Sequence, residues 1–125
     1  MKARALALLC GLGAVLGPIP DLGAQVPDCS WCLPLWGQSA EIVPEEPFVE
    51  TFDLSKGKAY YFWIDADPQP DLDIDGPVSP PKCTRAGREQ MCTFDALDEG
   101  AAKITLTAEE EPIQALMSFG FDTRG

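Results

Sequence analysis

Five aspartates lie within eleven consecutive residues, and they form the densest group of chemistry-bearing side chains in the sequence. Carboxylate oxygens are the ligands that Ca²⁺ prefers, and a bound cation relieves the mutual repulsion of closely spaced carboxylates. The cluster therefore suggests a calcium site, with a solvated acidic strand face as the alternative. The candidate ligands are Asp65, Asp67, Asp71, Asp73 and Asp75.

Two better-defined chemistries fit the acidic segment poorly. Residues 71–76 match the first half of an EF-hand loop, but its twelfth position is Lys82, where such a loop needs a bidentate glutamate. A glycosidase pair needs two carboxyl groups facing each other across a cleft, for which a domain of this size has little room. We expect a non-enzyme, and a small hydrolase using Asp or Glu acid–base chemistry stays the alternative.

The composition excludes several function classes. The 125-residue chain has 20 acidic and nine basic side chains, a net charge of -11 and no histidine. Such a chain lacks the basic patch that binds nucleic acid, so no nucleic-acid partner is expected. Without histidine, a Ser-His-Asp triad, a Cys-His dyad and a His-ligated metal are impossible.

The N-terminal residues 1–24 have the features of a secretory signal peptide. Lys2 and Arg4 precede an apolar stretch over residues 6–16, and Ala24 is a small residue at the cleavage position. The apolar stretch is shorter than the roughly 20 residues that a membrane-spanning helix needs. We predict export to the periplasm, the cell surface or the extracellular space, and no membrane span in the mature chain.

The four remaining cysteines form two pairs in the sequence. An even number of cysteines in an oxidising compartment indicates disulfides, and a bond between Cys83 and Cys92 would stabilise the fold by roughly 2–3 kcal/mol. Cys29 and Cys32 form a C-x-x-C, for which a local disulfide is the first interpretation. A redox motif would need a thioredoxin-like context, and a four-cysteine zinc site would need closer spacing of the second pair.

Short strands are predicted beyond residue 47. Runs of aromatic and β-branched residues alternate with turn residues at a spacing of about ten, which indicates an antiparallel β-sandwich. In residues 71–75, strict alternation places two apolar side chains on one face and three carboxylates on the other. The predicted strands cover residues 48–54, 59–64, 71–75, 91–94, 102–107 and 115–121, with a polar loop over residues 76–90.

The segment before them, residues 25–47, is rich in proline and lacks periodicity, so we predict an irregular N-terminal arm. Four large apolar side chains lie in a part of this arm that cannot bury them in a helix of its own. They either fold back over one face of the sandwich or dock onto a partner protein, where tryptophan is enriched. They are Trp31, Leu33, Leu35 and Trp36.

The order of features between residues 52 and 121 resembles the bacterial pre-peptidase C-terminal domain, an appendage of secreted proteases and collagenases. Residues 52–62 match its opening strand, glycine turn and aromatic strand, residues 71–74 match its aspartate strand, and residues 92–94 match its second cysteine with the following Thr-Phe. The resemblance implies a jelly-roll-like sandwich without catalytic residues, with calcium bound in some members. The chain departs from the pattern because it lacks a further strand before residue 71 and no protease domain precedes the match.

Together these features predict a non-enzymatic exported module, residues 48–125, that binds a protein partner or an extracellular polymer. We expect it to be an accessory or structural subunit of an envelope or extracellular assembly, with Ca²⁺ as the candidate stabilising ion. The alternative binding function is that of a calcium-dependent carbohydrate-binding module. Its stacking surfaces would be Trp31, Trp36, Tyr60, Tyr61 and Trp63.

Overall fold

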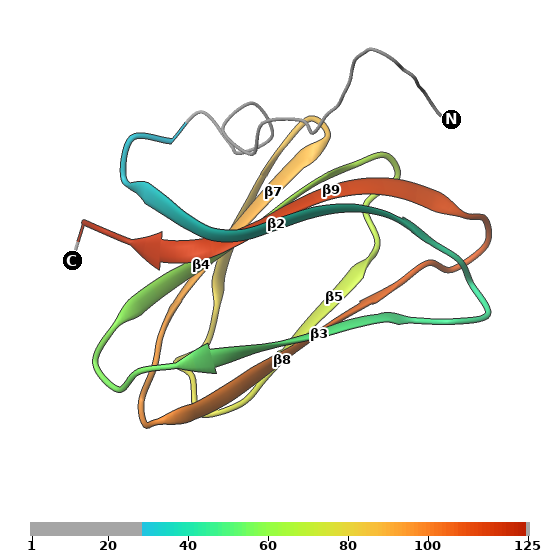
Figure 1. Cartoon of the computed structure of the whole chain (residues 1–125). Helices are drawn as coiled ribbons and strands as arrows, with labels where there is room; N and C mark the ends of the chain where they lie inside the picture. The colour runs from blue at the N-terminus through green and yellow to red at the C-terminus, as the bar shows by residue number, and fades with distance from the viewer. Residues whose placement is uncertain (1–28, 125) are drawn as a thin grey trace, which may run out of the picture.

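Residues 29–124 are described by a computed structural model, and they form two antiparallel sheets without a helix (Figure 1). The larger sheet has the strand order β2-β9-β4-β7-β6, and the smaller sheet has the order β3-β8-β5. The predicted all-β sandwich is therefore confirmed, whereas the predicted signal peptide lies outside the described residues. The strands are β2 (Cys32–Ile42), β3 (Phe48–Leu54), β4 (Ala59–Ala66), β5 (Asp71–Asp75), β6 (Lys82–Ala86), β7 (Glu89–Asp95), β8 (Gly100–Thr107) and β9 (Ile113–Asp122).

The structure corrects the predicted irregular arm, because Cys32–Ile42 forms strand β2 and pairs with β9. The register of this pair shifts between Pro34 and Trp36, and such a bulge breaks the alternation that would reveal a strand in the sequence. A proline is tolerated here because β2 is an edge strand, whose outer side makes no ladder hydrogen bonds.

The predicted polar loop over residues 76–90 is corrected in the same way. Lys82–Ala86 forms strand β6, and β7 already begins at Glu89. Every residue of β6 is exposed, so this strand has no buried face and shows no hydrophobic alternation.

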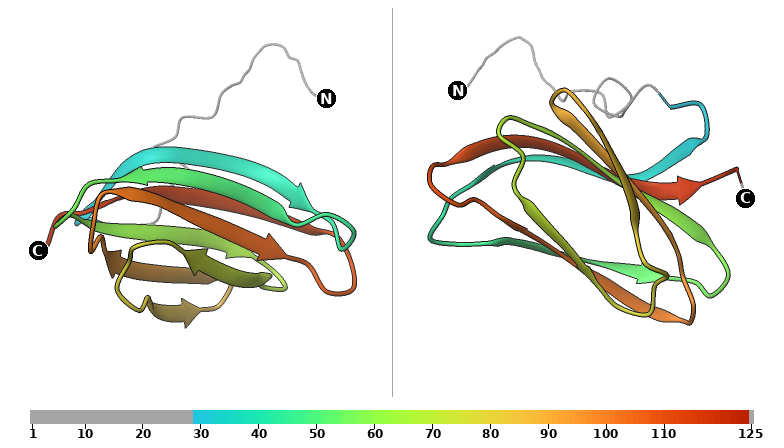
Figure 2. Two further views of the ribbon diagram at one scale, coloured as in Figure 1. Left: turned by 90° about the horizontal axis from the view of Figure 1, so that it is seen from below. Right: turned by 180° about the vertical axis from the view of Figure 1, so that it is seen from behind.

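A pair of antiparallel chain segments runs from the larger sheet into the smaller one. β2 pairs with β9 in the larger sheet, and the strands that directly follow and precede them, β3 and β8, pair in the smaller sheet. The β2–β3 and β8–β9 connections consequently lie at the same end of the sandwich (Figure 2). This pair of segments holds one side of the sandwich together.

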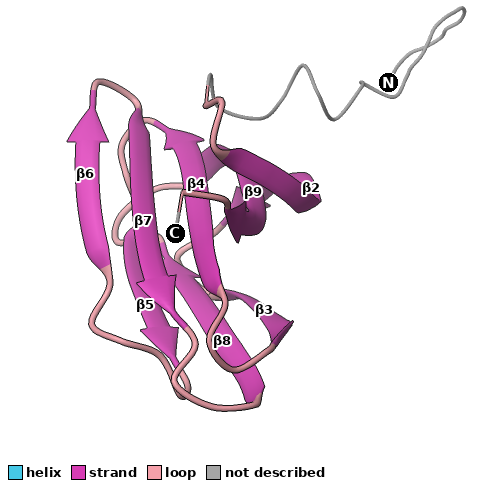
Figure 3. Cartoon of the chain, turned by 90° about the vertical axis from the view of Figure 1, so that its left-hand side faces the viewer, coloured by secondary structure: helices cyan, strands magenta, loops and turns pink. Residues whose placement is uncertain are grey.

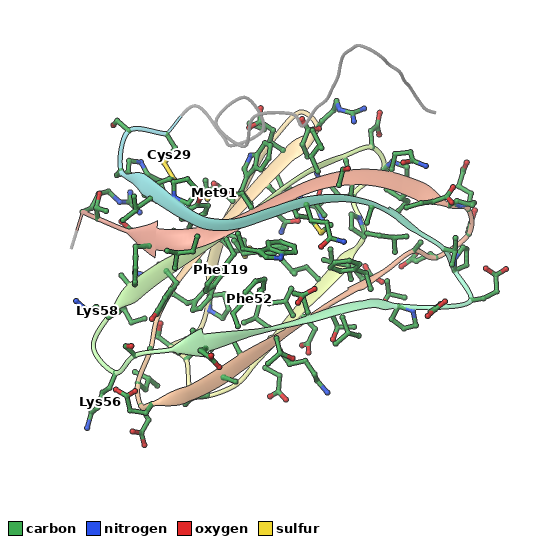
Figure 4. All side chains as sticks on the ribbon, in the orientation of Figure 1. Cys29, Phe52, Lys56, Lys58, Met91 and Phe119 are labelled. Carbon is green, nitrogen blue, oxygen red and sulfur yellow. A yellow bond between two sulfur atoms is a disulfide. The ribbon has the colours of Figure 1, made fainter. Side chains whose placement is uncertain are left out.

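Aromatic side chains fill the space between the sheets. Phe52 of β3 and Phe119 of β9 stack with ring centroids 4.0 Å apart, and both lie between the two sheets (Figure 4). Tyr60 stacks on Phe119 at 5.4 Å, and Trp36 meets Phe52 edge-on at 5.0 Å. Such pairs contribute roughly 0.5–1.5 kcal/mol beyond the burial of their area, so β2 is tied to the core by Trp36.

The two sheets differ in width, with five strands facing three. β6 and β2 form the opposite edges of the larger sheet, and β5 is an edge of the smaller one (Figure 3). Near β6 the smaller sheet ends at β5, and a hollow of about 420 Å³ is lined by residues of β5, β6 and β7. The sandwich is therefore open along this side.

Candidate functional site

The five predicted calcium ligands are divided among the two sheets and the connection between β4 and β5. Asp71, Asp73 and Asp75 are exposed on the outer face of β5, as the alternation predicts. Asp65 belongs to β4 of the larger sheet, where its Oδ1 accepts a hydrogen bond of 2.8 Å from Nε of Arg88. Asp67 is exposed in the connection between β4 and β5.

This arrangement gives calcium little support. Within residues 29–124 there is no group of three or more His, Cys, Asp or Glu side chains placed to hold a metal ion. The calcium site stays a prediction.

A carboxyl pair that the sequence did not reveal joins Asp71 to Glu109, in the turn after β8. The pKa of Glu109 is raised by its side-chain hydrogen bond with Asp71 and by the charge of that carboxylate. Both side chains are exposed. A glycosidase separates its two carboxyl groups by about 5–9.5 Å, so a directly hydrogen-bonded pair in solvent does not fit that mechanism.

Both cysteine pairs lie at disulfide distance. Cys83 and Cys92 are directly opposite residues of β6 and β7, with an S–S distance of 2.03 Å. Cys29 and Cys32 are joined across the turn that leads into β2, with an S–S distance of 2.08 Å. The disulfide interpretation of both pairs agrees with the structure, and sulfurs joined in this way leave no thiolates for a four-cysteine zinc site.

The predicted partner-binding side chains of the arm fall into two groups. Trp36 packs into the core, whereas Trp31 lies on the outer face of the larger sheet, 6.4 Å edge-on from Tyr61. The guanidinium carbon of Arg124 lies 3.6 Å from the centre of the Trp31 ring.

The two leucines of this segment remain accessible, since Leu33 is 51% and Leu35 is 52% exposed. Leu33 also lines a hollow of about 410 Å³ together with Lys58 and Phe121. The exposed apolar part of the predicted partner surface therefore consists of Leu33 and Leu35.

The aromatic side chains proposed as a carbohydrate platform are largely inaccessible. Tyr60, Tyr61 and Trp63 are all buried, and Trp63 donates a hydrogen bond of 2.9 Å from Nε1 to Glu89. A sugar ring stacks on the exposed face of an aromatic side chain, which these three residues do not offer. These three residues therefore offer no stacking platform for a sugar.

Three more polar residues at the open side went unrecognised in the sequence. Arg85 of β6, Gln90 of β7 and Glu109 line adjoining hollows beside β5. Gln90 could have been recognised from the sequence, because a polar residue at an inward position of an alternating strand is unusual. Gln90 occupies an inward position beside Cys92 and Phe94.

No family model, curated protein or solved structure matches this chain. The resemblance to the pre-peptidase C-terminal domain therefore remains a hypothesis that depends on residues 52–121 alone. The described residues, 29–124, contain no helix that is long and apolar enough to cross a membrane.

Proposed function

We propose that this chain is an exported, non-enzymatic accessory module that binds a protein partner. The observation that carries the proposal is the exposure of Leu33 and Leu35 on a free sheet edge, in a domain whose other large apolar side chains are mostly buried. Apolar side chains held on a rigid element are suited to a partner protein, because burying the exposed half of each leucine would stabilise the complex by about 0.8–1.5 kcal/mol.

The surroundings of these leucines favour side-chain contacts over strand pairing. Pro34 lies between them and has no backbone N–H, and the bulge beside it interrupts the strand edge. The edge of β2 is therefore a poor template for a further strand, while the side chains of Leu33 and Leu35 remain accessible. The two disulfide-distance cysteine pairs support an oxidising environment outside the cytosol.

The proposal can be tested by purifying the chain, with a crosslinker present, from the organism that makes it. We expect one partner protein in a fixed ratio, and we expect it to be lost from the Leu33→Lys/Leu35→Lys variant. Val49→Lys is the matched control, because Val49 is 50% exposed on strand β3 of the other sheet. Melting temperatures would confirm that both variants are folded. A partner retained equally by both variants, or no partner at all, would refute the proposal.

A further inference from the structure

The open side of the sandwich carries a second candidate surface, at the opposite edge of the larger sheet from the leucines of β2. The hollow of about 420 Å³ lies between β5 of the smaller sheet and β6 and β7 of the larger one. Its apolar part includes the half-buried Leu72 and Ile74 of β5 and Cys83 of β6, and Pro70 and Pro81 also line it. A second hollow of about 400 Å³ adjoins it, since Asp71 and Arg85 line both.

The oxygen of a buried side-chain amide beside this hollow has no hydrogen-bond partner. Gln90 is only 9% exposed, and its Oε1 makes no hydrogen bond within residues 29–124. Its Nε2 lies 3.9 Å from Sγ of Cys92, which is a weak acceptor. A buried amide oxygen without a donor is unfavourable, so a ligand that supplies an N–H or O–H to it would remove that cost.

The strand beside the hollow is a free edge. β5 pairs only with β8, and alternate backbone N–H and C=O groups of an edge strand point away from its single partner. These groups form a template for one further strand, as in known modes of peptide recognition by sheet edges. In contrast to β2, strand β5 contains neither a proline nor a register shift.

The charges on β5 determine which kind of polypeptide strand can pair with its free edge. The outer face carries Asp71, Asp73 and Asp75, and on the β8 side only Asp75 is opposite a cation, Lys103. Two copies of β5 could not pair with each other without placing carboxylates side by side. A strand with basic outer side chains would neutralise them.

The adjoining hollow reinforces this selection. Glu109, Glu110 and Glu111 line it together with Asp71, against a single guanidinium from Arg85. The raised pKa of Glu109 reflects the crowding of its carboxyl against Asp71, which a cation would relieve. None of the residues lining either hollow is aromatic, which argues against a sugar and for a polypeptide.

We infer that β5 binds an extended polypeptide segment with alternating basic and apolar residues, which adds to the smaller sheet as a fourth strand. Its basic side chains face Asp71 and Asp73, and its apolar side chains enter the hollow beside Leu72 and Ile74. A donor group of the segment pairs with Oε1 of Gln90 once this side chain has turned toward the hollow, because solvent does not reach that oxygen in the free chain. This surface does not include Leu33 or Leu35. Peptide binding at β5 can therefore be found whether or not a protein partner binds the two leucines, and a partner can bind the leucines whether or not β5 binds a peptide.

The test is calorimetric titration of the whole chain with a heptapeptide in which lysine and valine alternate. A heptapeptide of the same composition, with the lysines grouped at one end, is the peptide control. We expect the alternating peptide to bind at least about ten-fold more tightly, because only it presents one basic and one apolar face to β5. Equal binding of both peptides, or no binding of either up to millimolar concentration, would overturn the inference.

Variants of the chain test the assigned contacts. We expect Asp73→Asn to weaken binding about two- to five-fold, and Gln90→Leu to weaken it about two- to ten-fold. Asp53→Asn is the matched control, because Asp53 is an exposed aspartate on β3, the other edge strand of the same sheet. The Leu33→Lys/Leu35→Lys variant should bind the heptapeptide as the unmodified chain does. Equal losses in Asp73→Asn and Asp53→Asn would show attraction by net charge alone and would contradict the assigned site.

Methylated peptides separate strand addition from electrostatic adhesion. In an added strand, the N–H groups of alternate residues point at β5 and those between them point away. Methylating the nitrogens of one alternate set should therefore weaken binding at least about ten-fold, and methylating the other set should weaken it far less. Equal affinity of the two methylated peptides would refute strand addition.

Discussion

The hydrogen bond between Tyr61 and Ser118 is the best place to test how the larger sheet is stabilised. The two hydroxyl oxygens are 2.8 Å apart, and both residues are fully buried on neighbouring strands β4 and β9. Ser118→Ala would leave the Tyr61 hydroxyl buried without this partner. The cost of such an unpaired hydroxyl is about 1–3 kcal/mol, which corresponds to a melting temperature lower by roughly 4–8 °C for each kcal/mol.

The double variant decides whether the bond itself is responsible. Tyr61→Phe alone should cost about 1 kcal/mol, because it leaves the serine hydroxyl without its partner. Tyr61→Phe/Ser118→Ala removes both hydroxyls, so it should cost less than the sum of the single variants by about 1–2 kcal/mol. The measurement is urea unfolding of all four proteins. Strictly additive losses would refute the interpretation that the two hydroxyls form a buried hydrogen-bonded pair.

The same residue predicts a dependence on alkaline pH. Burial raises the pKa of Tyr61 above its ordinary value of 10.0, although the hydrogen bond with Ser118 acts in the opposite direction. The folded state therefore retains the phenol proton at a pH where the unfolded chain has lost it. The stability that Tyr61 contributes is complete below pH 10.0 and is lost as the pH rises through the folded-state pKa. The stability difference between the unmodified chain and Tyr61→Phe should be constant below pH 9 and fall above pH 10, and a difference that stays constant would contradict the assignment.

Three further perturbations follow from the structure. Gly120→Ala should lower the free energy of unfolding by at least about 1–3 kcal/mol in urea unfolding, because a Cβ there would lie 2.8 Å from Cα of Pro34 and still closer to the carbonyl oxygen of Leu33; an unchanged midpoint would contradict this close approach. Cys83→Ala/Cys92→Ala should lower it by roughly 2–3 kcal/mol, whereas an unchanged melting temperature would argue against a bond between these residues. Arg124 lowers the pKa of Asp122 from 3.8 through a side-chain hydrogen bond, so Asp122→Asn should reduce the melting temperature above pH 4, and the reduction should shrink as the pH falls through the lowered folded-state pKa; a pH-independent difference would exclude this pair.

The sequence predicts strands well where one face of the strand is buried. Residues 71–75 were predicted with their true bounds, because the alternation of aspartate with Leu72 and Ile74 reflects one half-buried and one exposed face. The cysteine pairing was also predictable, since few pairings are open to four cysteines in two close pairs. In both cases the signal is local in the sequence.

Strands β2 and β6 escaped prediction because each lacks that local signal. The bulge beside Pro34 disrupts the alternation of β2, and β6 is exposed on both faces. Gly120 was the available clue to β2, since a glycine inside a strand marks the close approach of another backbone.

The open side between β5 and β6 could not be predicted from local patterns at all. It exists because five strands face three, and this depends on long-range pairing of strands that sequence periodicity does not encode. The aspartates of β5 were recognised as a chemical feature, but their neighbours were not. Gln90 and Glu109 approach them only in the folded chain.

The most direct test of the binding function assigned to this fold is nuclear magnetic resonance of the isotope-labelled chain with the alternating lysine–valine heptapeptide. We predict nuclear Overhauser contacts between the peptide backbone and β5, slowed exchange of the β5 amide protons that point away from β8, and a shift of the Gln90 side-chain amide. Changes restricted to the glutamates at 109–111, with the β5 amides unaffected, would contradict this prediction.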